Sequence, residues 1–239
     1  MKKTAIITNI AIAAILLVLS ISIFSIDLER VYSGSNTPTV AAPVTIGNRN
    51  LKNVSFMICI ETDTDPAIVT EMMNAFSLRS VSATFFVSGS WAMRNPQTLR
   101  HMHTLGFEIA NHGFSGRSIK GLSAEKQKKE IQDTHTLVKG LTNIEMKLFF
   151  PPAGEYSKDT LKVAQALGYT VVLSCCNVDT NSPSATADAI FNAATSNPKN
   201  GDLILLCPTR NAVTAIPNII DFYLGQEFGI IKVSDNIAT

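Results

Sequence analysis

The feature that most constrains this fold is a repeated alternation of short apolar runs with segments of helical periodicity. Residues 54–60 form a nearly continuous apolar run, typical of a strand buried on both faces, and a helix-period segment over 66–78 follows it. The same order of elements recurs along most of the chain. Strands that alternate with helices pair in parallel and are covered by helices, so the sequence predicts an α/β fold.

The remaining expected elements continue this pattern to residue 206. Further strands are expected at 83–87, 107–110, 147–150, 170–173 and 203–206, and further helices at 96–105, 123–139, 157–167 and 185–194. Roughly seven such units in about 190 residues predict a small, irregular or incomplete (β/α) barrel rather than an open doubly wound sheet. Any chemistry is then expected where the strands end.

Composition narrows the class of partner. Hydrophobic residues make up 46% of the 239-residue chain and charged residues 16%, which excludes a disordered tail or linker. The 20 basic and 19 acidic residues give a net charge of +1. The chain therefore lacks the excess of basic residues that binds a polyanion, and nucleic acid is not an expected partner. Four cysteines lack the spacing of a zinc finger or a redox pair, and most are interpreted as small buried hydrophobes.

The N-terminus has the pattern of a membrane anchor. Lys2 and Lys3 precede an uncharged run from Thr4 to Ser25, and about 20 residues suffice to span the hydrocarbon core as a helix. Basic residues before the run, and Asp27 and Glu29 after it, place the N-terminus in the cytoplasm. We therefore expect a single-pass protein of the cell membrane with an extracytoplasmic body.

Three regions follow from this interpretation. Residues 1–25 are the cytoplasmic stub and transmembrane anchor, 26–51 a polar, Pro- and Gly-punctuated extracytoplasmic stalk, and 52–239 the folded domain. Cleavage as a secretory signal peptide is the alternative for the first region, although residues 21–25 offer no clear small-x-small site.

Five segments in the body carry a family resemblance. They are ATFFV at 83–87, GFEIANHGFS at 106–115, FFPPAG at 149–154, LGYTVV at 167–172 and GDLILL at 201–206. In this order they resemble the polysaccharide deacetylase family, the NodB homology domain, from about residue 52 to the C-terminus. The anchor and short body are most similar to the membrane-anchored, sporulation-type branch of that family.

The resemblance implies a fold, a substrate class and a mechanism. Members remove N-acetyl groups from N-acetylglucosamine-containing polymers, so cell-wall polysaccharide or peptidoglycan is the implied partner. A divalent metal held by one Asp and two His polarises the amide carbonyl, and its bound water is the nucleophile. A neighbouring Asp acts as base and a His from a late motif acts as acid.

The first motif carries substitutions at both chemical positions. Aligned without gaps, Glu61 falls at the base position and Thr62 at the position of the metal carboxylate. The register is open by a residue or two, so Asp63 or Asp65 could supply that carboxylate instead. An ordinary solvated loop with a helix cap would have the same composition, and that alternative stays open.

The second motif keeps one of two histidines. His112 stands at the first metal-ligand position, whereas Gly116 stands where the second His belongs, and glycine has no donor side chain. His112 is alternatively a buried structural histidine without a metal.

The third motif keeps the two prolines that bend the chain but lacks the family's positively charged Arg. Pro151 and Pro152 are retained, but Phe150 replaces the family's Arg, which implies a less polar pocket that favours a protonated acid at Glu61. Phe150, the two prolines and Phe114 are the expected substrate-binding residues, with burial in the core as the alternative for the two Phe side chains.

The fourth and fifth motifs are also altered. Asp179 is at most a supporting acid, and Cys207 occupies the general-acid position, where the family has His. A thiol at Cys207 could donate a proton or bind metal, but burial would raise its pKa.

The five motifs thus keep their Gly, Pro and apolar residues, while most of the family's catalytic and metal-ligand residues are substituted. This pattern predicts a catalytically degenerate protein that acts as a glycan-binding or structural factor of the envelope or of sporulation. No cofactor is expected unless a zinc site is rebuilt from Asp63, His112 and Cys207. The alternatives are an active metal-dependent deacetylase of peptidoglycan with an atypical site, and a scaffold for another envelope protein.

Overall fold

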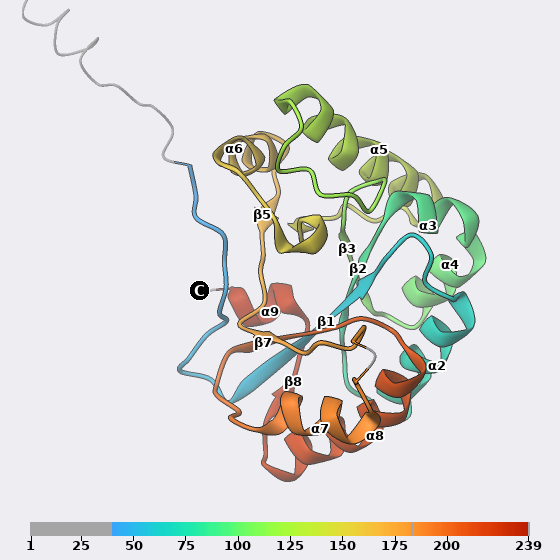
Figure 1. Ribbon diagram of the computed structural model, residues 1–239, viewed down its shortest axis with the longest axis vertical. Helices are drawn as coiled ribbons and strands as arrows, with labels where there is room; N and C mark the ends of the chain where they lie inside the picture. Colours follow the sequence, from blue (N-terminus) through green and yellow to red (C-terminus); the bar gives the residue numbers. More distant parts are fainter. Residues whose placement is uncertain (1–39, 183, 239) are drawn as a thin grey trace, which may run out of the picture. The chain divides into compact units, whose positions relative to one another are not determined.

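A parallel sheet forms the centre of the molecule (Figure 1). The computed structural model describes residues 40–238, except residue 183. The strands run in the order β5-β4-β3-β2-β1-β7-β6, with β8 beside the start of β1, and every pairing is parallel. Strands β5 and β6 are the two ends of this path and do not pair with each other in the described residues. The α/β class and the incomplete barrel are therefore confirmed.

The element bounds follow the expected alternation. The strands are β1 (Asn53–Ile60), β2 (Thr84–Val87), β3 (Glu108–Asn111), β4 (Leu148–Phe149), β5 (Thr170–Val171), β6 (Cys176–Asn177), β7 (Asp202–Leu206) and β8 (Gly229–Ile230). The helices are α2 (Pro66–Ser77), α3 (Gly89–Arg94), α4 (Pro96–Thr104), α5 (Ala124–Thr142), the 3-10 turn η1 (Pro152–Gly154), α6 (Lys158–Ala166), α7 (Ala187–Thr195), α8 (Arg210–Gly225) and α9 (Val233–Ile237).

Apart from the short turn η1, five of these elements are not expected from the sequence pattern: α3, β6, α8, β8 and α9. The largest of them, α8, contains Pro217 in its interior, a residue that usually ends a helix because it lacks an amide hydrogen. Here the helix continues through the proline, and the Thr209 side chain caps its first turn by accepting a hydrogen bond from Ala212. Packing of an apolar face against the sheet outweighs the local cost of the proline.

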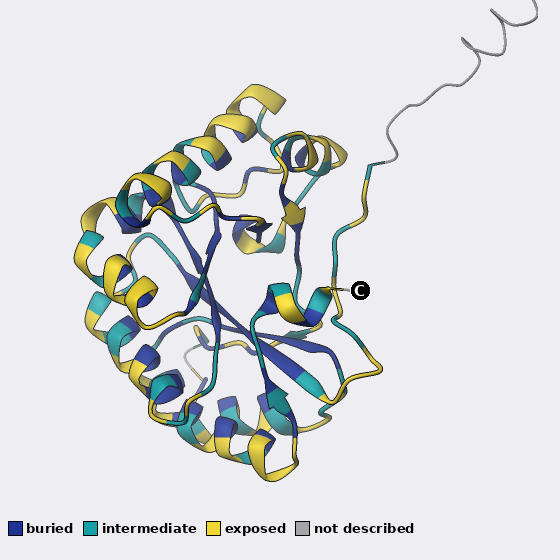
Figure 2. Ribbon diagram, turned by 180° about the vertical axis from the view of Figure 1, so that it is seen from behind, coloured by how far each residue is buried: buried dark blue, intermediate teal, exposed yellow. Residues whose placement is uncertain are grey.

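The central strand β1 separates two apolar cores. Its residues Phe56, Ile58 and Ile60 belong to the larger core, between the sheet and the outer helices. Met57 and Cys59 belong to a smaller core on the inner side of the curled sheet. Figure 2 shows the central strands largely buried and the helices exposed on their outward faces. Both faces of β1 are covered, which explains why its sequence does not alternate with polar residues.

The short helix α9 closes the inner core at the end where the strands begin. The amide of Val233 donates to Thr84 Oγ1 at 2.9 Å, and Thr84 Oγ1 donates to Glu108 Oε2 at 2.6 Å. Asn236 Nδ2 donates to Ser55 Oγ at 3.0 Å. Because this end is plugged, a groove that serves chemistry must open at the opposite end, where the strands finish.

Residues from Val40 onward belong to the compact unit, although the sequence placed residues up to 51 in a stalk. The amide of Val44 donates to Val171 O at 2.8 Å, and Leu173 N donates to Val44 O at 2.8 Å. This segment therefore extends the sheet beside β5.

The expected anchor at 1–25 lies outside the described residues. None of the helices within residues 40–238 has both the length and the apolar character needed to cross a bilayer.

The contact of Thr84 with α9 gives a stability prediction. Thr84→Val keeps the volume but leaves the Val233 amide and the Glu108 carboxylate short of a partner, which should lower the free energy of unfolding by about 1–3 kcal/mol. Thr214→Val, at an exposed position of α8, is the matched control and should change it by less than about 0.5 kcal/mol. Urea denaturation measures both, and equal effects would contradict the role of α9 as a plug.

Candidate functional site

A groove of about 480 Å³ opens where the strands end. Its walls come from the ends of β1 and β7, from the turn after β4, and from the loops on both sides of β6. The lining residues are Cys59, Glu61, Phe150, Ala153, Gly154, Leu173, Ser174, Asn177, Val178, Asp179, Thr180, Asn181, Leu205 and Cys207. The location agrees with the expectation that strand ends carry the site.

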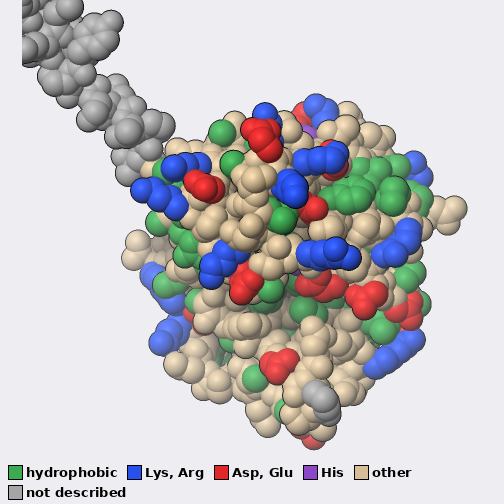
Figure 3. All heavy atoms as spheres, turned by 45° about the horizontal axis from the view of Figure 1, so that its top comes forward, with side chains coloured by type: hydrophobic (Ala, Val, Ile, Leu, Met, Phe, Trp, Pro, Cys, Tyr) green, Lys and Arg blue, Asp and Glu red, His purple; other side chains and the backbone are tan. Residues whose placement is uncertain are grey.

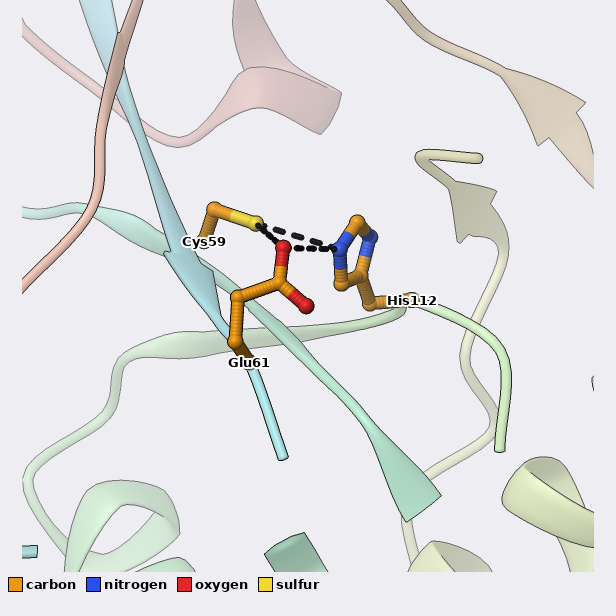
Figure 4. Close-up of side chains that lie close together, drawn as sticks. All are labelled: Cys59, Glu61 and His112. Atoms are coloured by element: carbon orange, nitrogen blue, oxygen red, sulfur yellow. Dashed lines mark hydrogen bonds and ion pairs between the residues drawn. The ribbon is translucent and has the colours of Figure 1, made fainter. Parts of the chain in front are cut away.

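Three side chains that could hold a metal ion meet at the base of this groove (Figure 4). Cys59 Sγ lies 3.1 Å from His112 Nε2 and 3.5 Å from Glu61 Oε1, and the last two atoms are 3.3 Å apart. Cys59 and Glu61 are two residues apart at the end of β1, so their side chains point to the same side. His112 follows β3 directly.

His112 is completely buried, and Phe150 fixes the position of its ring. Its Nδ1 atom lies 2.7 Å from the carbonyl oxygen of Phe150, and its ring stacks on that of Phe150 with centroids 5.1 Å apart. A carbonyl oxygen only accepts hydrogen bonds, so Nδ1 must carry the proton. In the neutral ring, Nε2 then has a free lone pair directed at Cys59 and Glu61.

Glu61 is more acidic than the sequence suggested. Burial raises the pKa of Glu61. The hydrogen bond and charge of His112 and the hydrogen bond from Cys59 lower it by a larger amount, so the net pKa lies below its usual value. The expectation of a protonated Glu61 is therefore wrong. It assumed that the loss of an Arg leaves the carboxyl without a partner, whereas His112 supplies one.

Cys207 is a second thiol next to Cys59. It follows Leu206, which pairs with Ile58, so the two cysteines lie at adjacent positions of β7 and β1. A hydrogen bond from Cys59 lowers the pKa of Cys207 to about 7, although burial opposes this shift. The same contact and burial raise the pKa of Cys59 well above its usual value. Burial does raise the pKa of Cys207, as expected, but the net pKa is nevertheless lowered, because the hydrogen bond from Cys59 stabilises the thiolate by more.

The cysteines differ in burial more than expected. Cys59 is buried, Cys176 and Cys207 are half-buried, and Cys175 is exposed. The interpretation as small buried hydrophobes thus holds fully only for Cys59, because Cys175 and Cys176 lie at an edge of the sheet, beside and in the terminal strand β6.

The two family ligand positions flank the site but do not fit a metal. Thr62 offers a hydroxyl, and its carbonyl oxygen accepts a hydrogen bond from Arg94. Gly116 has a φ of +67°, and a Cβ placed there would lie 2.8 Å from Thr62 Cγ2 and 3.3 Å from Glu61 Oε2. Both positions therefore lie beside Glu61, and neither carries a histidine or carboxylate that could bind a metal.

The acidic alternatives from the first motif lie elsewhere. Asp63 is exposed and does not belong to the cluster at the groove base. Asp65 caps α2, since its Oδ1 accepts from Ala67 N at 2.8 Å. Asp179 does line the groove, and its Oδ1 organises the loop by accepting from Asn181 N at 3.2 Å and Ser182 N at 3.0 Å.

Of the expected substrate-binding residues, Phe150 is the one that lines the groove. Its ring also packs edge-on against Phe86, with centroids 5.8 Å apart. Pro151 and Pro152 are buried behind it, and Phe114 is half-buried with its amide bound to Glu130 Oε2 at 2.8 Å. These three residues are not part of the groove lining.

Cys59 is the site residue that the sequence analysis missed. The available signal was its spacing, because a residue two positions before Glu61 on a strand shares its face. The apolar run around Cys59 concealed that signal, since burial is the ordinary state of a cysteine in a strand.

Residues 48–172, just over half of the chain, match the family described as polysaccharide deacetylase. The chain belongs to the polysaccharide deacetylase family. A relative described as peptidoglycan-N-acetylglucosamine deacetylase from Bacillus cereus is 27% identical over 183 residues, which cover 74% of this chain and 85% of the relative. The uncharacterized protein YlxY of Bacillus subtilis is 24% identical over 74% of this chain and 55% of its own length.

Solved structures of family members share the fold. The Bacillus anthracis protein BA3943, described as a CE4 family pseudoenzyme, superposes with a TM-score of 0.79 at 20% identity, over 82% of this chain and 69% of that chain. The Bc1960 peptidoglycan N-acetylglucosamine deacetylase gives 0.76 at 21% identity, over 81% and 92% of the two chains.

The thiol pair gives a prediction about reactivity. In metal-free, reduced protein, alkylation of Cys207 should rise through about pH 7, because its thiolate forms in that range, while buried Cys59 should stay nearly unlabelled. Cys59→Ala removes the hydrogen-bond donor that stabilises the Cys207 thiolate and should move the midpoint to higher pH. Iodoacetamide labelling with site-resolved mass spectrometry measures both rates, and an unshifted midpoint in Cys59→Ala would contradict the assigned cause.

Proposed function

We propose that this chain is a catalytically degenerate, membrane-anchored polysaccharide deacetylase-like protein that binds cell-wall glycan in its groove. The observation that carries the proposal is a retained groove of about 480 Å³ beside two lost metal ligands, at Thr62 and Gly116. The fold and His112 at the first ligand position are retained, whereas the other two metal-ligand positions, Thr62 and Gly116, lack suitable donor atoms.

The groove lining suits a neutral sugar chain. Asn177, Asp179 and Asn181 offer polar groups along one side, and Leu173 and Phe150 offer apolar surface. Trp91, an aromatic that could have served as a sugar platform, is completely buried and donates from Nε1 to Thr64 O at 2.8 Å. Sugar recognition in this proposal therefore rests on polar contacts more than on aromatic stacking.

The surface charge supports a neutral partner as well. Figure 3 shows basic side chains interspersed with acidic ones on the face in view, rather than gathered by sign. A nucleic acid would need a basic stripe, and a neutral polysaccharide would not. A relative described as peptidoglycan-N-acetylglucosamine deacetylase also supports a cell-wall polysaccharide as the partner.

Loss of several catalytic groups together should abolish the family reaction. Catalytic residues act as a unit, so removal of two metal ligands, the acid and the orienting Arg should leave little activity. The cluster of Cys59, Glu61 and His112 favours one alternative, an active deacetylase with an atypical site. A scaffold for another envelope protein is the other alternative.

Glycan binding in the groove can be tested with one blocking variant. Full-length protein in mild detergent should bind N-acetylglucosamine oligomers by calorimetry and release no acetate from them. Ser174→Trp fills the groove and should weaken binding at least tenfold, whereas Leu78→Trp, at a position 82% exposed outside the groove, should not. Oligomer affinity unchanged in Ser174→Trp would contradict groove binding, and catalytic acetate release would contradict degeneracy.

The membrane placement is a separate proposal that rests on the sequence of residues 1–25 and on the charges that flank them. In this proposal the body lies outside the cytoplasm, where peptidoglycan is found, and the association with the envelope and with sporulation belongs to the same proposal.

Protease added to intact cells tests this placement. It should degrade the body and spare a short fragment that carries an N-terminal tag, detected by immunoblot, because the bilayer shields only what precedes the body. Lysed cells serve as the control in which the tagged end is also accessible. A body that resists protease in intact cells and is digested after lysis would reverse the topology.

A further inference from the structure

We propose that Cys59, Glu61 and His112 bind a thiophilic divalent cation of the zinc class at the base of the groove. This set differs from the Asp and two His of the family, because the sulfur and the carboxylate both come from β1. The inference is independent of the proposed glycan binding, since metal binding and oligomer binding have separate readouts.

The spacing of the three donor atoms fits a single ion. Their separations are 3.1, 3.3 and 3.5 Å. A tetrahedral zinc ion with bonds of about 2.3 Å to sulfur and about 2.0–2.2 Å to nitrogen and oxygen holds its ligands roughly 3.3–3.6 Å apart. Shifts of a few tenths of an ångström therefore suffice to bind an ion.

The contacts among the three side chains suit a bound cation. The proton on His112 Nδ1 is directed to Phe150 O, so Nε2 faces Glu61 Oε1 at 3.3 Å and Cys59 Sγ at 3.1 Å. Without a metal, a proton between Glu61 and His112 joins these two groups as an ion pair. One cation in its place would contact the sulfur, the nitrogen and the oxygen together.

The support around His112 is that of a metal ligand. A ligating histidine usually donates its other ring nitrogen to a backbone carbonyl or carboxylate, which fixes the ring and its tautomer. The Phe150 carbonyl does this at 2.7 Å, and the Phe150 ring stacks on the imidazole at an interplanar angle of 9°. Cys59 and Glu61 both line the groove, so an ion can reach the site from solvent.

Sulfur in the set decides the class of ion. Thiolate with imidazole favours zinc and other thiophilic metals over Mg²⁺ or Ca²⁺, which prefer oxygen ligands. Co²⁺ is a suitable probe because it occupies zinc sites and gives an intense near-ultraviolet charge-transfer band only when a thiolate is bound.

Cobalt titration tests the assignment on the full-length chain in mild detergent, reduced and freed of metal by a chelator. We expect one Co²⁺ per chain with a thiolate charge-transfer band. Cys59→Ser should lose that band and weaken affinity at least tenfold, and Glu61→Gln should keep the band but also bind at least tenfold more weakly. Cys176→Ser, outside the cluster, is the matched control and should bind like wild type.

Three results would overturn the proposal. Wild-type protein could give no band, the band could persist in Cys59→Ser, or Glu61→Gln could bind as tightly as wild type. Circular dichroism of each variant separates loss of the site from loss of the fold. Because Cys59→Ser and Glu61→Gln preserve side-chain size, the test does not depend on a His112 variant that leaves a cavity in the core.

Discussion

The structure depends on β1 being buried on both faces. One set of its side chains packs under the outer helices and the other fills the curled interior, and the strand pairs with β2, β7 and β8. A strand in this position ends with its last inward-facing side chains at the groove, which is why Cys59 and Glu61 lie there. The location of the site is thus a consequence of packing and does not require retained catalysis.

The repeated strand–helix pattern was enough to predict the class, the parallel sheet and most element positions up to β7. It was not enough for α8, whose Pro217 is locally unfavourable, nor for α9, a single short turn fixed by Thr84 and Ser55 at the far end of the barrel. These elements form because of tertiary contacts, and a local pattern does not contain such contacts.

In the candidate site, too, some features could be predicted from the local sequence and others depend on tertiary contacts. Positions with a motif, such as His112, Thr62 and Gly116, could be placed from sequence because the motif carries the register of the strand end. The ionisation of Glu61 could not, because it depends on a histidine 51 positions away. The proximity of Cys59 to Cys207 likewise follows from the pairing of β1 with β7, which is set by the closure of the sheet.

The backbone conformation at Gly116 disfavours a histidine at this position. Gly116 has a φ of +67°, a conformation that glycine adopts freely and a histidine would adopt only with strain. A Cβ at that position would also press on Thr62 Cγ2 at 2.8 Å, which real structures do not tolerate without movement. A side chain at position 116 would therefore require Thr62 to move. A histidine ligand at 116 would require this loop to change its path, whereas the donor atoms of Cys59, Glu61 and His112 already lie within 4.8 Å of one another at the ends of β1 and β3. The proposed metal site therefore needs less rearrangement with these three residues than with side chains at 62 and 116.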